Sequence, residues 1–266
     1  MNKSLTVIII LCAILLGSCN EKKPENAAME QSDQSDLTNS SANGKAVNDP
    51  VDATATKISQ KLKPLNPDLP TIGILTFNGV LMTEVTAPLD VFSKNSEAGK
   101  PLFNVITIGE SYDMITCEEG LKMFPDYIYS NAPELDVVIV PSAYDMTTKV
   151  KDTKLLEFIT KQNTNTDYTV SNCAGASLLG ATGIADGKKI VTWIGGGSDL
   201  QKNYPNLLVQ DDSEVSYVED GKFISSNGNL ASYISSLELL EKLTDKEHRK
   251  LVESHLYLDR LQQWKN

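Results

Sequence analysis

Continuously apolar segments that alternate with helical segments restrict this chain to a small group of folds. The segments 71–77, 103–108 and 136–140 are rich in β-branched residues and carry few polar side chains. Strands that are apolar on both faces are typical of a parallel sheet that helices cover on both sides. The sequence therefore predicts an α/β fold, a three-layer αβα sandwich with a mostly parallel, flavodoxin-like sheet.

The other expected elements complete this pattern. Periodicity predicts helices over 79–99, 155–160, 178–184, 231–243 and 246–264. It also predicts strands over 167–172, 189–193 and 214–225, the last of which turns at 219–221.

Cys173 lies where a predicted strand turns sharply into a helix, in the segment VSNCAGAS (170–177). Nucleophile elbows of α/β enzymes have this layout, with small residues around the nucleophile because the turn is cramped. The N–H groups and the positive dipole end of the following helix favour a thiolate over a thiol. The sequence leaves two interpretations open, a reactive thiol or a small buried core residue.

The first residues have the parts of a bacterial export signal. Lys3 precedes an apolar stretch over 5–16, which is too short to span a hydrocarbon core of about 30 Å. We therefore expect a cleaved signal peptide over 1–18. The small residues before Cys19 resemble a lipobox, which implies that Cys19 is lipidated and anchors the exported protein to a cell-envelope membrane, on its periplasmic or surface face. An ordinary secretory signal is the alternative.

Composition separates a tether from a single domain. Residues 19–66 are polar and aperiodic, which predicts a disordered tether, and 67–266 is long enough for one domain with a full core. Residues 1–66 hold seven lysines and seven acidic residues, so the net charge of −11 lies entirely on the domain. An acidic domain argues against nucleic acid or anionic lipid as a partner, and membrane contact is expected only through the lipid on Cys19.

Two cysteines remain in the predicted mature domain, Cys117 and Cys173, because Cys12 leaves with the signal and Cys19 carries the lipid. In an oxidising compartment these two could form a disulfide. One pair is not a disulfide framework, and a core of this size needs no covalent link. The sequence leaves their pairing open.

Four segments together resemble the ThiJ/PfpI superfamily, whose fold is class I glutamine-amidotransferase-like. They are 72–92, 124–141, 172–189 and 217–228, in the order and at the spacing of that family. The resemblance covers nearly all of 70–245 and is nearest to the isonitrile-hydratase and parkinsonism-associated deglycase branches. Related proteins are commonly dimers, so a homodimer is the assembly that it implies.

The resemblance implies that the cysteine works with a carboxylate. The family's first-loop carboxylate matches Glu84, which would face Cys173; a solvated acid early in a helix is the alternative. An ionised carboxylate would raise the pKa of the thiol, whereas a buried, protonated one could donate to a thiolate. The implied oxyanion hole uses backbone N–H groups of Ala174 and of the loop where Ser142 and Ala143 replace the usual glycines.

Departures from the family narrow the implied chemistry. Ala174 follows the cysteine directly, Thr192 and Trp193 stand where relatives can have a histidine, and His248 and His255 both fall in the terminal helix. A Cys-His dyad is therefore not expected. We expect a hydratase or hydrolase that acts on a small electrophile without metal or cofactor, or else a non-catalytic protein that binds a small ligand or senses oxidation through its cysteine. The candidate pocket residues are Trp193, Tyr144 and Asn229.

Overall fold

A computed structural model describes residues 63–258 and 260. Its main sheet contains β1 (Thr71–Leu75), β2 (Asn104–Gly109), β5 (Tyr127–Ile128), β6 (Val137–Val140), β7 (Tyr168–Asn172), β10 (Tyr217–Asp220) and β11 (Phe223–Ser226). The strand order is β10-β11-β7-β6-β1-β2-β5, and only the β10–β11 pair is antiparallel. The predicted mostly parallel sheet is confirmed.

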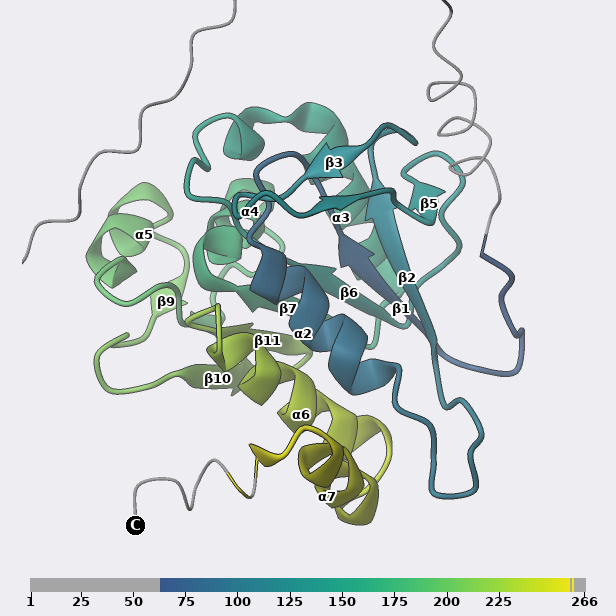
Figure 1. Cartoon of the computed structure of the whole chain (residues 1–266). Coiled ribbons are helices and arrows are strands. Elements are labelled where there is room, and N and C mark those ends of the chain that lie inside the picture. Colours follow the sequence, from purple (N-terminus) through teal and green to yellow (C-terminus); the bar gives the residue numbers. More distant parts are fainter. Residues whose placement is uncertain (1–62, 259, 261–266) are drawn as a thin grey trace, which may run out of the picture. The chain divides into compact units, whose positions relative to one another are not determined.

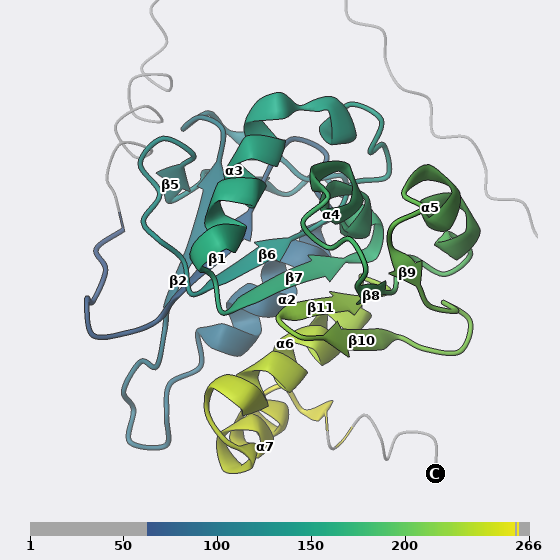
Figure 2. The same cartoon turned by 180° about the vertical axis from the view of Figure 1, so that it is seen from behind.

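Helices cover both faces of this sheet (Figures 1 and 2). On one face α2 (Met82–Phe92) packs against α6 (Ala231–Leu243), and on the other α3 (Thr153–Asn165) packs beside α4 (Ala176–Thr182). The last helix, α7 (Lys246–His255), packs against α6. Every residue of β1 and β6 is buried, which explains why these strands are apolar throughout instead of alternating.

The strand predicted over 189–193 is confirmed only for its first two residues. Only β8 (Lys189–Ile190) is a strand, and it pairs with β9 (Leu208–Val209) in a separate two-stranded sheet. The next residues bond to side-chain and elbow groups: the N–H of Val191 donates to Ser225 Oγ at 2.9 Å, and Thr192 Oγ1 donates to the carbonyl of Cys173 at 2.9 Å. The segment therefore becomes part of the functional site.

Other boundaries differ in ways that local geometry explains. The helix predicted over 79–99 is confined to α2, because Gly79 has a φ of +80° and Leu81 is still extended. The hairpin turns at Gly221 and Lys222, after both acidic residues of β10. The helix predicted over 246–264 ends as α7 at His255. Elements too short for a periodic signal were not predicted: β3 (Ile115–Thr116), β4 (Lys122–Met123), β5, α5 (Gly197–Asn203) and the 3₁₀ turn Lys149–Lys151.

The chain already contacts the domain at Lys63, ahead of the boundary predicted at 67. Lys63 Nζ donates to the carbonyl of Val105 at 2.7 Å, and the hydroxyl of Tyr127 donates to the carbonyl of Lys63 at 2.6 Å. The predicted signal peptide, Cys19 and the rest of the predicted tether lie outside the described residues. Within 63–258 and 260, no helix is both long and apolar enough to cross a membrane.

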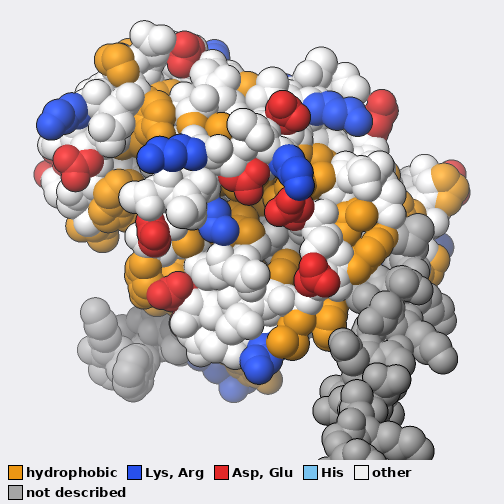
Figure 3. All heavy atoms as spheres, turned by 90° about the horizontal axis from the view of Figure 1, so that it is seen from above, with side chains coloured by type: hydrophobic (Ala, Val, Ile, Leu, Met, Phe, Trp, Pro, Cys, Tyr) orange, Lys and Arg blue, Asp and Glu red, His pale blue; other side chains and the backbone are white. Residues whose placement is uncertain are grey.

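Charges of both signs are interspersed over the domain. Figure 3 looks down on the molecule of Figure 1 and shows Lys, Arg, Asp and Glu side chains scattered among apolar ones. Arg249 of α7 forms ion pairs with Glu238 and Glu241 of α6, which link the two helices, and with Glu253 of its own helix. The face in Figure 3 offers no continuous basic surface of the kind that binds nucleic acid.

Candidate functional site

The end of β7 forms a strained elbow at Cys173. Its φ is +53°, in the left-handed region that residues with a side chain seldom adopt. A 3₁₀ turn (Cys173–Gly175) leads from it into α4. A Cβ at Gly175 would lie 2.4 Å from the carbonyl oxygen of Val140, so only glycine fits there. The small residues around the cysteine thus reflect a cramped turn, as the nucleophile-elbow interpretation predicts.

Glu84 lies in the first turn of α2 and faces the elbow. Its side chain is fully buried, so it is not the solvated helix acid of the alternative interpretation. Oε2 accepts a hydrogen bond from the N–H of Ser142 at 2.6 Å, whereas Oε1 has no hydrogen-bond partner among the described residues. A Cβ at Gly228 would lie 2.2 Å from Cys173 Cβ and 2.4 Å from Glu84 Oε1. The carboxyl and the thiol-bearing residue therefore both lie against the Cα of Gly228.

Burial dominates the acid–base behaviour of both groups. It raises the pKa of Glu84, although N–H groups of Ser142 and Asn229 favour the carboxylate. Burial, and then the charge of Glu84, raises the pKa of Cys173 to about 11, against the opposing effects of the Ser142 hydroxyl and the Ala174 N–H. The N–H of Ala174 at the start of the helical segment favours the thiolate, as expected, but burial and the charge of Glu84 outweigh it. The pair resists carrying two negative charges and titrates as a unit.

In the loop after β6, the N–H groups that the resemblance implies for an oxyanion hole bond to other groups of the protein in this structure. The N–H of Ser142 is bonded to Glu84, and the N–H of Ala143 donates to Met146 Sδ at 3.2 Å. Both groups are occupied in positioning the carboxylate and the loop. The N–H of Ala174, which lowers the pKa of the Cys173 thiol, is the predicted backbone donor that acts on the sulfur.

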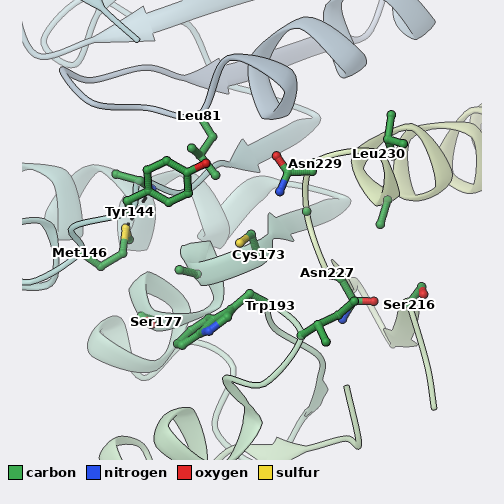
Figure 4. A pocket seen from close by; sticks show the side chains of 15 residues that line it. Leu81, Tyr144, Met146, Cys173, Ser177, Trp193, Ser216, Asn227, Asn229 and Leu230 are labelled. Atoms are coloured by element: carbon green, nitrogen blue, oxygen red, sulfur yellow. Dashed lines mark hydrogen bonds between the residues drawn. The ribbon is translucent and has the colours of Figure 1, made fainter. Parts of the chain in front are cut away.

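Cys173 opens into a cavity of about 700 Å³ (Figure 4). The three candidate pocket residues, Trp193, Tyr144 and Asn229, all line it. In Figure 4, Tyr144 and Trp193 lie on opposite sides of the cysteine, and Asn229 lies beside the start of α6. The loops after β1, β6 and β7 therefore meet at one edge of the sheet, where open α/β sheets bind ligands.

Sequence reasoning missed residues that support the elbow. Gly228 has a φ of +83°, and its Cα lies against both Cys173 and the carboxyl of Glu84. Thr192 donates to the carbonyl of Cys173, and Asn227 Nδ2 donates to the carbonyl of Thr192 at 2.7 Å. The Ser-Asn-Gly run after β11 signals a turn, but no pattern in the sequence indicates what that turn contacts.

The other candidate groups lie apart from this pair. Cys117 and Cys173 are both free and buried, so the structure contains no disulfide between them. Both histidines lie in α7, whose His248 is buried. In the part of the chain that the structure describes, no group of three or more His, Cys, Asp or Glu residues could hold a metal ion.

Comparison with known proteins identifies the family. Residues 70–242 match the profile of the DJ-1/PfpI family. The chain belongs to this family. An isonitrile hydratase from Pseudomonas putida is 29% identical over 186 residues, which cover 70% of this chain and 77% of that protein. Protein dj-1beta from Drosophila melanogaster is 25% identical over 138 residues, 51% of this chain and 71% of the relative.

The fold of this DJ-1/PfpI protein is likewise shared with solved structures. A ThiJ/PfpI family protein from Pseudomonas syringae has a TM-score of 0.64 at 20% sequence identity, with coverage of 75% of this chain and 83% of the other. The class I glutamine-amidotransferase-like fold that the four sequence segments imply is thereby confirmed. The homodimer stays a prediction.

Glu84→Gln is expected to change the pH dependence of stability in this DJ-1/PfpI domain. The pKa of Glu84 is raised above 4.5 by folding, so the folded state binds this proton more tightly than the unfolded state. The wild type must therefore lose stability as the pH rises from 4.5 through the folded pKa, whereas glutamine does not titrate. Urea unfolding should be measured for both proteins between pH 4.5 and 8. As the pH rises, the free energy of unfolding of the variant should increase relative to that of the wild type. A difference that is constant with pH would contradict a buried titrating carboxyl.

Proposed function

We propose that this DJ-1/PfpI protein adds Cys173 covalently to a small electrophilic molecule, with Glu84 as the proton carrier, in a reaction of the hydratase or hydrolase type. The observation that carries the proposal is a fully buried carboxyl held against a strained elbow cysteine, with one oxygen that has no hydrogen-bond partner among the described residues. Burying an ionisable group costs stability, so a purely structural role offers no reason for it. Perturbed acids of this kind are concentrated at functional sites.

The raised pKa of Glu84 suits it to general base catalysis. As Cys173 Sγ attacks the electrophilic carbon, the thiol proton passes to Glu84, so that a free thiolate is never required. The protonated carboxyl then returns the proton to the substrate. The N–H of Ala174, next to the sulfur, stabilises negative charge that develops during the addition.

An isonitrile illustrates the full reaction, since an isonitrile hydratase is among the relatives. The sulfur bonds to the terminal carbon, and that carbon takes the proton from Glu84 to give a thioimidate. Water adds to the same carbon, the C–S bond breaks, and the thiol is regenerated. The product is the N-substituted formamide, so the balance is one isonitrile and one water. For a 2-oxoaldehyde the corresponding product is the 2-hydroxy acid.

Redox sensing is the less favoured function for this site. Sensor cysteines are accessible and have a low pKa, because the thiolate is the form that is oxidised. Cys173 is buried, and its pKa is raised to about 11. The other alternative is that the cavity binds a small ligand without turnover, and an assay that measures both binding and product distinguishes it from catalysis.

Purified protein should be assayed with alkyl and aryl isonitriles and with 2-oxoaldehydes, and the products followed by mass spectrometry. We expect turnover of at least one class, its loss in Cys173→Ala and its retention in Cys117→Ala, the matched change at the other buried cysteine. Binding of both classes without product, or equal turnover in the two variants, would contradict the proposal.

We further propose that the domain is exported and anchored through a lipid on Cys19, as the small residues before it suggest. In a bacterial host, the full chain should fractionate with membranes, and Cys19→Ala should move it to the soluble fraction. Intact-mass analysis should show an acylated Cys19 as the first residue of the wild type. An unmodified, unprocessed chain would contradict lipidation.

A further inference from the structure

We infer that the loop 193–197 makes the cavity selective for an uncharged electrophile with an apolar body. The inference rests on the proposed function only in that it takes Cys173 as the reacting residue. It concerns the kind of molecule that reaches the sulfur, and it does not require that the molecule be turned over.

The cavity is lined without a single Lys, Arg, His, Asp or Glu side chain among the described residues. A carboxylate or phosphate that entered would lose its hydration and gain no cationic partner. Glu84 Oε1 and Cys173 both lie against Gly228, so the negative charge of the ionised carboxyl would repel an anion at the sulfur. The chain also carries a net charge of −11, which opposes the approach of anions.

The mouth of the cavity is apolar and solvent-exposed. Tyr144, Ile194 and Leu230 line it and are 74%, 73% and 77% exposed, so their hydrophobic surface is largely uncovered. These residues come from three separate segments of the chain. An apolar group attached to the electrophile would cover this surface as the reactive end reaches Cys173, and that burial favours binding.

The glycine run Gly195–Gly197 supports the wall on which such a group would rest, which Trp193 and Ile194 form. A Cβ at Gly196 would lie 2.0 Å from the indole of Trp193, so the ring packs directly on the backbone of Gly196. Asp212 Oδ2 accepts hydrogen bonds from the N–H groups of Gly195 and Gly196, the latter at 3.1 Å. The loop therefore presents Trp193 and Ile194 to the cavity and ties its own N–H groups to Asp212.

The test compares alkylating reagents that differ only in the group carried by the same iodomethyl carbon. Iodoacetamide is neutral, iodoacetate is anionic and N-benzyl iodoacetamide is neutral with an apolar body. In each case the sulfur displaces iodide and the thiol proton leaves to solvent. The rate at Cys173 in the full chain is followed by mass spectrometry of its peptide, with the urea-unfolded chain as reference. The ratio of the rates of two reagents does not depend on the pKa of the thiol, because all three reagents react with the same thiolate.

In the folded chain, we expect the rate of alkylation by iodoacetamide divided by the rate by iodoacetate to exceed the same ratio in the unfolded chain about tenfold or more. The benzyl reagent should react with Cys173 faster than iodoacetamide does. Ile194→Lys should bring the first ratio toward the reference, whereas Leu121→Lys, an exposed apolar residue outside the cavity, should not. Trp193→Ala should remove the benzyl preference. Ratios equal to those of the unfolded chain would overturn the inference. Failure of turnover alone would overturn only the proposed function.

Discussion

Glu84→Gln is expected to lower turnover about 10²- to 10⁴-fold, the usual contribution of a positioned general base. Glutamine preserves the size of the side chain, and its carbonyl oxygen can still accept the 2.6 Å hydrogen bond from Ser142. It cannot accept the proton of the Cys173 thiol. The loss should therefore appear in kcat as well as in kcat/KM, because the proton moves in the transition state.

Glu118→Gln is the matched control, because Glu118 is an exposed acid. Its backbone N–H donates to the carbonyl of Val80, and this bond does not involve the side chain. It should leave turnover within about twofold of the wild type, as surface changes generally have small effects. Near-wild-type turnover in Glu84→Gln would show that the carboxyl is not the proton carrier.

Gly228→Ala is expected to lower the free energy of unfolding by about 2–5 kcal/mol and to abolish turnover. A Cβ there would lie 2.2 Å from Cys173 Cβ and 2.4 Å from Glu84 Oε1, at a φ of +83°. Left-handed backbone costs a residue with a side chain about 1–2 kcal/mol, and overpacking of a filled site adds about 1–3 kcal/mol. The thiol and the carboxyl must move to make room.

Gly99→Ala separates these two contributions. Gly99 has a φ of +75° but no atom within 4 Å of the added Cβ, so only the backbone strain applies. Urea unfolding should show a smaller loss in Gly99→Ala than in Gly228→Ala, with turnover unchanged. Equal losses in the two variants would mean that Gly228 is required only for its backbone conformation.

The sheet was predictable because its central strands are buried on both faces and therefore read as continuous apolar runs. Of the strand predicted over 189–193, only Lys189–Ile190 is a strand, because an apolar run does not reveal its partner. Val191 donates to the side chain of Ser225 and Thr192 to the carbonyl of Cys173, and neither residue joins the backbone ladder of the main sheet. Strands of two residues such as β5 are too short to carry a periodic signal. Their pairing depends on the assembled sheet.

The site was predictable to different degrees. Cys173 stands out locally, because small residues surround a strand-to-helix turn. Glu84 was identified only through the family resemblance, since an acid in the first turn of a helix is ordinarily solvated. Its burial, and with it the raised pKa of the thiol, depends on how α2 and Gly228 pack against the elbow. The directions of the Ser142 and Ala143 N–H groups follow from loop geometry that sequence does not reveal.

The most direct test of the Cys173–Glu84 pair is the pH dependence of alkylation at Cys173 by iodoacetamide in the wild type and in Glu84→Gln. With a pKa of about 11, the wild-type rate should still rise tenfold per pH unit at pH 9.5, without a plateau. The variant lacks the charge that opposes the thiolate, so its rate should level off at a lower pH. A wild-type plateau near the ordinary thiol value of about 8.5, unchanged in the variant, would contradict a buried thiol coupled to Glu84.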